Sequence, residues 1–327
     1  MTGEARASAV AHANIALVKY WGKKDAELVI PRTSSLSMTL DAFYTTTTVS
    51  FLEREGEDEV TLDGAAVTGE PRRRVTAFLD LVRARAGRTG KAVVDSVNAV
   101  PTGAGLASSS SGFAALALAA STACGLALDE TALSRLARRG SGSASRSVFG
   151  GFAQWNAGHD DTSSYAEPVP SAGFDPVLVV ALVNTGHKSV NSRDAMRHTV
   201  STSPLYQAWV DSSAEDLKEM REAVGRADLD AVGVIAERNA LGMHATMLAA
   251  RPAVRYLAPT TVSVLDTVLE LRKAGVSAYA TMDAGPNVKV LCHRGDAAVV
   301  TDAIEKSARC KTVMAGVGPA ARLVEAP

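Results

Sequence analysis

Apolar residues recur at helical spacing in several parts of the chain. The segment 71–86 begins at a proline and ends before a glycine, and its apolar side chains lie three or four positions apart, at Val75, Phe78, Leu79 and Val82. This pattern predicts an amphipathic helix. Similar spacing and end signals predict helices over 106–123, 129–139, 261–274 and 296–308, and a mostly helical stretch over 192–250.

Other segments have the residue types of β-strands. Residues 45–53 are rich in β-branched side chains, and 60–68 is divided by Asp63-Gly64, a dipeptide typical of a tight hairpin turn. Further strands are predicted over 91–97, 148–155, 164–168, 177–184, 276–282 and 287–292. Helices lying on antiparallel strands indicate an α+β fold built from two sandwiches of helix on sheet.

Length and composition narrow the function classes. A chain of 327 residues suits two domains, which we place at 1–178 and 179–327. With 34 Lys+Arg against 35 Asp+Glu, the chain lacks the basic excess expected of a nucleic-acid-binding protein. Its three cysteines have no CxxC spacing, which argues against disulfides and zinc and fits a reducing cytoplasm. No apolar run is long enough to cross a bilayer, so we expect no membrane partner.

The most specific motif is a glycine-bearing loop, PTGAGLASSSSG over 101–112, that runs into a predicted helix. Gly103 and Gly105 permit close backbone approach, and the free N–H groups of a helix start attract polyphosphate. A Walker A loop is excluded because no Gly-Lys-Ser/Thr follows, and Ser108 replaces the third glycine of a dinucleotide fingerprint. A serine-capped helix after an ordinary turn is the simpler alternative, but capping needs about one hydroxyl. The remaining serines suit phosphate and Mg²⁺.

Three further segments combine charged and polar groups. Lys19-Tyr-Trp-Gly-Lys23 gathers two cations and a phenol, which suits an anion, although core aromatics with solvated lysines would also explain it. The segment 141–146 presents three hydroxyls and Arg146 on a small-residue loop suited to a carboxylate, or else it is a solvated loop after a helix. The segment 283–287 contains turn-forming residues and, in Asp283, one carboxylate.

The motif Pro-x-Gly-x-Gly-Leu-(Gly/Ala)-Ser-Ser resembles the ATP-binding signature of the GHMP kinase superfamily, and this copy is similar to that of the bacterial-type diphosphomevalonate decarboxylases. Segments 13–23, 140–147 and 282–288 match the same family in order along the chain. The resemblance implies a ribosomal-protein-like α/β N-terminal domain and a ferredoxin-like α+β C-terminal sandwich, with the active site between them. It also implies a homodimer that uses ATP and Mg²⁺ to convert mevalonate 5-diphosphate to isopentenyl diphosphate.

The resemblance also implies roles for individual residues. The catalytic groups would be Asp283, beside the hydroxyl that is phosphorylated and acting as orienter or base, with Arg146, Lys19 and Ser192. The substrate site would comprise Tyr20, Trp21 (mainly as packing), Gly22, Lys23, Arg74, Ser141, Gly142, Ser143, Ala144, Ser145, Arg146, Ser192 and Arg193. ATP would contact Ser96, Asn98, Gly103, Gly105, Ala107, Ser108, Ser109, Ser110 and Lys188, with Mg²⁺ on Ser108 and Ser109.

Alternatives to some of these assignments remain open. Arg72 and Arg73 leave the register of Arg74 open, and His244 is interpreted as a helix-packing residue. A related kinase or decarboxylase acting on mevalonate or its monophosphate is the nearest rival. A non-catalytic nucleotide-binding protein is a rival of another class, but it would be expected to lack Asp283 or the serine run.

Overall fold

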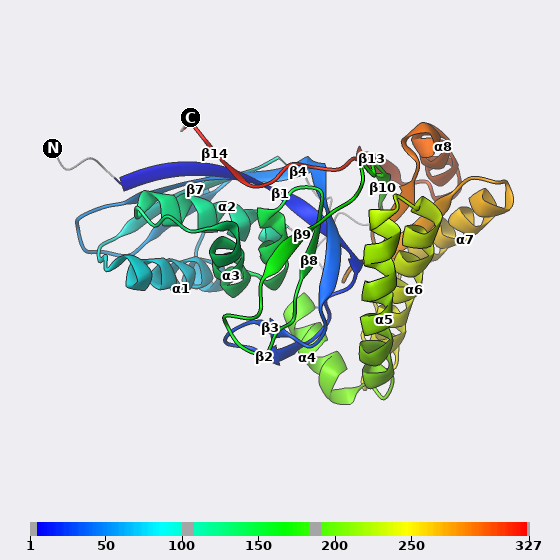
Figure 1. Ribbon diagram of the computed structural model, residues 1–327, viewed down its shortest axis with the longest axis horizontal. Helices are drawn as coiled ribbons and strands as arrows, with labels where there is room; N and C mark the ends of the chain where they lie inside the picture. Colours follow the sequence, from blue (N-terminus) through cyan, green and yellow to red (C-terminus); the bar gives the residue numbers. More distant parts are fainter. Residues whose placement is uncertain (1–4, 100–107, 184–190, 326–327) are drawn as a thin grey trace.

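The computed structural model describes residues 5–99, 108–183 and 191–325, which form two large sheets with helices packed on them and a small two-stranded sheet (Figure 1). The first part of the chain contains β1 (Ala5–Val18), β2 (Lys23–Asp25), β3 (Ile30–Pro31), β4 (Ser35–Phe51), β5 (Glu59–Leu62), β6 (Ala65–Ala66), α1 (Gly69–Ala86), β7 (Ala92–Ala99), α2 (Ser108–Ala123), α3 (Glu130–Gly140), the 3-10 helix η1 (Gly142–Val148), β8 (Phe152–Trp155) and β9 (Ala166–Val169). The second part contains β10 (Val177–Leu182), α4 (Ser192–Thr202), α5 (Tyr206–Gly225), α6 (Leu229–Leu248), α7 (Pro259–Lys273), β11 (Ala278–Met282), β12 (Val288–Cys292), η2 (Arg294–Asp296), α8 (Ala297–Ala308), β13 (Lys311–Ala315) and β14 (Arg322–Val324).

The first sheet has eight strands, with a path β14-β1-β4-β7-β5-β6 from which β8 and β9 branch at β4. Its pairs are antiparallel except β5 with β7. Helices α1, α2 and α3 pack on the sheet in Figure 1, and α2 lies against β1 and β4. The face of α2 in the core is lined by small side chains, including Ala114, Ala117 and Ala120. Small side chains let a helix approach the sheet closely, and the hydroxyl of Ser111 in the first turn of α2 lies 2.8 Å from that of Thr45 on β4.

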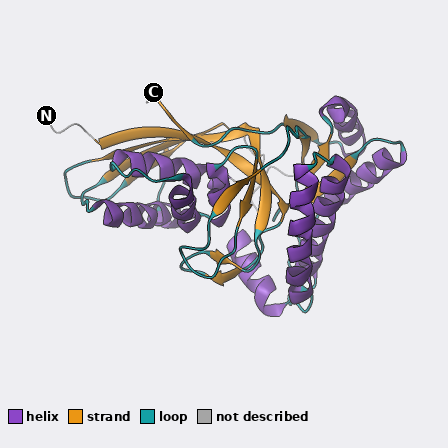
Figure 2. Cartoon of the chain, viewed as in Figure 1, coloured by secondary structure: helices purple, strands orange, loops and turns teal. Residues whose placement is uncertain are grey.

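The second sheet is a four-stranded antiparallel array, β11-β12-β10-β13. Helices α7 and α8 cover one face, where Val268 and Ile304 join its core. On the other face, Val180 and Leu291 pack in one cluster with side chains of α5 and α6 and with Ile15 and other residues of β1 and β4. Figure 2 shows the long α5–α6 pair standing between the two sheets. The two parts of the fold therefore share a core, and the surface between them can hold a site in fixed geometry.

The predicted α+β class with two parts is confirmed. Several elements differ from prediction, however. The strand predicted over 148–155 is wrong in its first half, because η1 continues to Val148 and only Phe152–Trp155 is extended. The helical stretch 192–250 is three helices, separated at Ser203 and around Asp228. The division at 178/179 stays a prediction, and β14 pairs with β1 in the first sheet.

Two further findings concern what the described residues do not form. None of the described helices combines the length and apolar composition needed to cross a bilayer. The described residues also contain no cluster of three or more His, Cys, Asp or Glu side chains arranged to hold a metal ion.

Candidate active site

A carboxylate between two buried lysines marks the centre of the candidate site. Asp283 follows β11, Lys19 follows β1, and Lys289 lies within β12. The Nζ atom of Lys19 is 2.8 Å from Oδ1 of Asp283, and that of Lys289 is 3.0 Å from Oδ2. The two lysine side chains are only 2% and 4% exposed, whereas the Asp283 side chain is 37% exposed. The carboxylate therefore faces an opening, while the cations lie beneath it.

Electrostatics fix the protonation of this cluster. Burial favours the neutral form of Asp283, but the ion pairs with Lys19 and Lys289 outweigh it and hold the pKa of that carboxyl well below its usual range. Burial lowers the pKa of Lys19 to about 8, against the opposing attraction of Asp283. Asp283 is thus an anion, and both of its oxygens accept hydrogen bonds.

Arg146 is a second buried charge, carried by η1. Its Nε donates to Ser37 Oγ at 2.9 Å and its Nη2 to Asn14 Oδ1 at 3.2 Å, while Nη1 donates to Ser35 Oγ. Burial lowers the pKa of Arg146 to about 10, although Asp283 opposes this. All three acceptors are neutral, and no ion pair of Arg146 is found among the described residues. A buried guanidinium held in this way suits an anionic ligand.

The serines of the segment 141–146 differ in their exposure. The segment is not the predicted loop, because it enters η1. The hydroxyls of Ser141 and Ser143 lie 3.4 Å apart and are partly exposed. Ser145 is buried and donates to its own segment at Gly142 O, 2.8 Å away, and Ala144 packs in the apolar core. Ser141 and Ser143 are therefore better placed for a ligand than Ser145 or Ala144.

Gly142 and Gly22 are needed for close packing around the same site. A Cβ atom on Gly142 would lie 2.7 Å from the Trp155 ring and 3.0 Å from Tyr20. A Cβ on Gly22, whose φ is +118°, would lie 1.9 Å from the hydroxyl of Tyr206, which donates to Trp21 O. Trp21 itself is buried in an apolar cluster with residues of α4 and α5. These contacts support a packing role for Trp21 and fix the backbone of the 19–23 segment.

A second group of cations comes from three separate elements: Lys23 in β2, Arg74 in α1 and Arg193 in α4. Burial lowers the pKa of Lys23, and Arg193 and Arg74 lower it further. Burial also lowers the pKa of Arg74, and Arg193 adds to this effect. Glu70 reaches Arg193 only at 4.0 Å. The mutual repulsion of these cations would be relieved by a bound anion.

The contacts of two neighbouring arginines distinguish Arg74 from Arg72. Arg72 pairs with Glu57 at 2.9 Å, whereas Arg74 lies over the Phe113 ring and faces the other cations. Tyr20 packs edge-on against Trp155, and its buried hydroxyl has no hydrogen-bond partner in the described part of the chain. Burial raises the pKa of Tyr20. A ligand oxygen could accept from this hydroxyl, because Tyr20 stays protonated.

Only part of the predicted nucleotide site lies within the described residues. Gly103, Gly105, Ala107 and Lys188 lie outside the described residues, as does the side chain of Ser108. The described residues place Ser109 at the exposed start of α2, where its hydroxyl is 3.4 Å from that of Ser141. Ser110 is buried; Ser96 and Asn98, on β7, bond to Thr47 and Thr45 of β4 at 2.9 and 2.8 Å. The first turn of α2 carries no acidic residue, so its N-terminal field is not cancelled there.

Ser192 and three residues that the sequence analysis did not select complete the site. Ser192 is half-buried at the first position of α4, next to Arg193. Asn14, on β1, holds η1 by donating to Ser143 O and Ser147 Oγ at 2.9 and 2.7 Å. Asn239 accepts from the backbone N of Lys19 at 2.8 Å. Lys289 could have been found as the single charged residue within an otherwise apolar run.

His244 has the packing position that was predicted for it on α6, buried beside the cluster. Burial lowers its pKa to about 4, with Lys19 as the next contribution, so the ring is neutral. Its Nε2 atom has no hydrogen-bond partner among the residues described.

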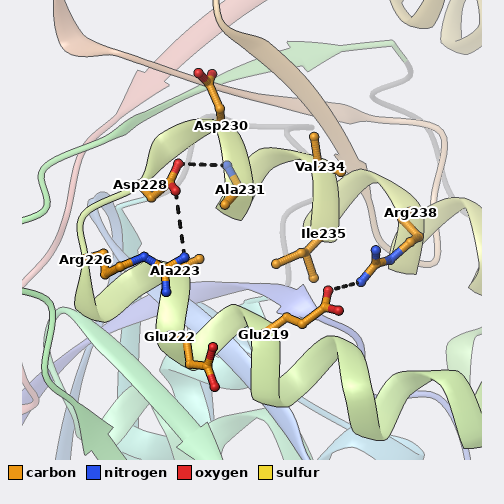
Figure 3. A pocket seen from close by; sticks show the side chains of 10 residues that line it. All are labelled: Glu219, Glu222, Ala223, Arg226, Asp228, Asp230, Ala231, Val234, Ile235 and Arg238. Carbon is orange, nitrogen blue, oxygen red and sulfur yellow. Dashed lines mark hydrogen bonds and ion pairs between the residues drawn. The ribbon is translucent and has the colours of Figure 1, made fainter.

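A recess of about 480 Å³ lies elsewhere, at the turn between α5 and α6 (Figure 3). Some of its charged groups already have partners: Arg238 pairs with Glu219, and Asp228 accepts from the backbone N of Ala231. None of its lining residues was predicted as part of the site. The recess therefore gives no reason to move the candidate site away from Asp283.

Comparison with known proteins identifies the family of the chain. Residues 11–166 match the diphosphomevalonate decarboxylase-like N-terminal domain, and 178–320 match the mevalonate 5-diphosphate decarboxylase C-terminal domain. The chain is 35% identical to the diphosphomevalonate decarboxylase of Homo sapiens over 88% of this chain and 76% of the relative. It is 32% identical to the phosphomevalonate decarboxylase of Haloferax volcanii, over 87% of each.

Solved structures give the same result. The structure of MDDEF in complex with MVAPP, AMPPCP and magnesium superposes with a TM-score of 0.95 at 46% identity, covering 99% of this chain and 100% of that one. The mevalonate diphosphate decarboxylase of Staphylococcus aureus superposes with a TM-score of 0.94 at 41% identity, covering 98% of each chain.

Fold and site together define a two-domain ATP-dependent enzyme with the architecture of the GHMP kinases. Within that class, the chain belongs to the diphosphomevalonate decarboxylase family.

Proposed function

We propose that the chain catalyses the ATP-dependent decarboxylation of mevalonate 5-diphosphate to isopentenyl diphosphate, releasing ADP, phosphate and CO₂. The observation that supports this substrate is the presence of two separate cationic groups. Arg146 lies near Asp283, and Lys23, Arg74 and Arg193 form the second group. A ligand with a carboxylate at one end and a diphosphate at the other matches both groups.

Arg146 is proposed to hold the substrate carboxylate. A guanidinium has five N–H donors, and Ser35, Ser37 and Asn14 take three of them. The remaining donors can bind a carboxylate while the neutral acceptors keep the head in place. This arrangement fixes the carboxylate before it leaves as CO₂, so the bond that breaks is held in one orientation.

Asp283 is proposed to orient the hydroxyl that attacks ATP. Both of its oxygens already accept from lysines, and its lowered pKa makes it a weak proton acceptor in this arrangement. It can still accept a hydrogen bond from the substrate hydroxyl through its exposed edge. Lys19 supplies positive charge beside it, and Ser192 is proposed to contact the substrate next to Arg193.

The residues present fit ATP and Mg²⁺. The first turn of α2 carries no acidic side chain and exposes the Ser109 hydroxyl. Mg²⁺ usually keeps several waters and binds substrate phosphates with few protein ligands, so hydroxyls suffice. When bound, Mg²⁺ would neutralise phosphate oxygens during transfer. We propose that Ser108 and Ser109 contact it and that Gly103, Gly105, Ala107, Ser110, Ser96, Asn98 and Lys188 line the nucleotide site.

The proposal is tested by incubating the purified chain with Mg-ATP and, separately, mevalonate, its 5-phosphate or its 5-diphosphate. ADP and CO₂ are followed independently. We expect equal release of both with the 5-diphosphate and little with the other two. Preference for the 5-phosphate would favour the activity named for the Haloferax volcanii relative, and ADP without CO₂ would indicate a kinase.

Location and assembly are further parts of the proposal. We place the enzyme in the cytoplasm because its few cysteines have no disulfide spacing, and Cys124, Cys292 and Cys310 are all free thiols. A homodimer is proposed from the family resemblance. Analytical ultracentrifugation should give twice the mass of one chain, and a single-chain mass would contradict it.

A further inference from the structure

Lys289 is a buried charge at a position where a strand would ordinarily carry an apolar residue. It lies in β12, between β11 and β10, where all five residues of the strand are buried. Its own side chain is 4% exposed. Burying an ammonium group costs free energy, and a hydrophobic side chain of similar length would fill the space without that cost. The charge therefore needs an explanation.

The contacts of Lys289 show what the charge does. Its Nζ is 3.0 Å from Asp283 Oδ2, and its second contact is the carbonyl of Asn287 at 3.4 Å. Lys19 approaches the other oxygen, Oδ1, at 2.8 Å. One cation on each oxygen restrains rotation of the carboxylate. With Lys19 alone, a partly exposed carboxylate could turn and present either oxygen to the substrate.

The structure assigns Lys289 as a positioning residue, which holds the Asp283 carboxylate in one plane beneath the substrate hydroxyl and keeps it ionised during the reaction. This role rests on the proposed function. The groups that face Asp283 come from four elements or their ends: Lys19 after β1, Arg146 in η1, His244 in α6 and Lys289 in β12. Three of these groups are cations and the His244 ring is neutral. The cations repel one another, so the charge of each influences the protonation of the others.

This coupling gives a measurable signature. Lys289 contributes to the lowered pKa of Lys19 through repulsion. If loss of the Lys19 proton disturbs Asp283, the rate should fall above a pH of about 8 in the unsubstituted enzyme. Removing the Lys289 charge raises the pKa of Lys19. The alkaline limb of the kcat profile should then move to higher pH, by roughly one pH unit.

The test compares Lys289→Met, Lys289→Arg and the control Lys311→Met, which removes an exposed lysine from β13, an edge strand of the same sheet that does not pair with β12. We expect Lys289→Met to lower kcat at least tenfold, to change KM for ATP less than twofold and to move the alkaline limb upward. Lys289→Arg should recover part of kcat, and Lys311→Met should resemble the unsubstituted enzyme.

A stability measurement keeps the test valid if Lys289→Met folds poorly. In the Asp283→Asn variant, Lys289 is a buried charge without its partner and destabilises the fold, so adding Lys289→Met should raise Tm. In the unsubstituted protein, Lys289→Met should lower Tm. The role is refuted if Lys289→Met keeps kcat within twofold and leaves the alkaline limb in place, or if Tm falls in both backgrounds. An unsubstituted chain that releases neither ADP nor CO₂ would instead refute the proposed function, and this role with it.

Discussion

Replacing Asp283 with Asn removes one negative charge from between two buried lysines and changes little else in shape. The variant leaves Lys19 and Lys289 as unpaired neighbours, each less than 5% exposed. Removing one partner of a buried ion pair typically costs ~3–5 kcal/mol. Because Asp283 itself is 37% exposed, solvent screens part of this, and we expect a loss of about 2 kcal/mol in the free energy of unfolding at pH 6.

The loss should depend on pH in a defined direction. Lys19 has a folded-state pKa of about 8, below its ordinary 10.5, so its burial penalty is complete below pH 8 and disappears as the pH rises from there towards 10.5. Without Asp283, the pKa of Lys19 should fall by roughly one to two further pH units. The variant then sheds this proton at a lower pH than the unsubstituted protein. The stability difference should therefore shrink between about pH 6 and pH 8, by at most ~1.4 kcal/mol per pH unit.

Urea denaturation at half-unit steps from pH 6 to 8.5 measures this difference, and comparing two proteins at each pH cancels the groups they share. The matched control is Asp175→Asn, which breaks an exposed pair with Arg294 at 2.7 Å and should cost about 0–1 kcal/mol at every pH. A pH-independent loss in Asp283→Asn would refute the reasoning, as would a loss no larger than in the control.

Three further predictions concern ligand binding. Lys23→Ala should raise KM for mevalonate 5-diphosphate at least tenfold and KM for ATP less than twofold, because Lys23 belongs to the second cationic group. Lys24→Ala, its exposed neighbour, serves as control. Equal effects on both ligands would remove Lys23 from the substrate site. Replacing Ser108 and Ser109 together with Ala should raise KM for ATP while calorimetric binding of the diphosphate substrate survives, and unchanged ATP kinetics would contradict the assignment. Arg146→Lys should lower kcat/KM about a hundredfold, since two charge-assisted hydrogen bonds are lost; a loss below fivefold would show that geometry at this position is unimportant.

The helices of the first half were predictable because their signals are local. The helix predicted over 71–86 is observed as Gly69–Ala86, and Asp129 caps α3 by accepting from the backbone N of Ala132. In contrast, β1 and the first half of β4 were missed. Their partners lie far along the chain, and the many alanines of β1 give a weak strand signal alone.

The site was predicted from motifs, but its supporting residues were not. Arg74 and Arg72 have the same side chain, and only the packing of α1 shows which one faces the other cations. Lys289 is a single residue in an apolar strand, and its role depends on a carboxylate brought beside it by strand pairing. Contacts of this kind arise from tertiary structure, so a local pattern can mark such a residue as unusual but does not reveal its partner.

The pairing of β14 with β1 has a consequence for how the protein is made. Val10 pairs with Arg322, so nearly the whole chain must be synthesised before that edge of the first sheet is complete. Until then β1, the strand that leads to Lys19, presents an open edge able to pair with other chains. We expect nascent chains stalled before β14 to need chaperone protection, and translation speed late in the message to affect the yield of folded enzyme.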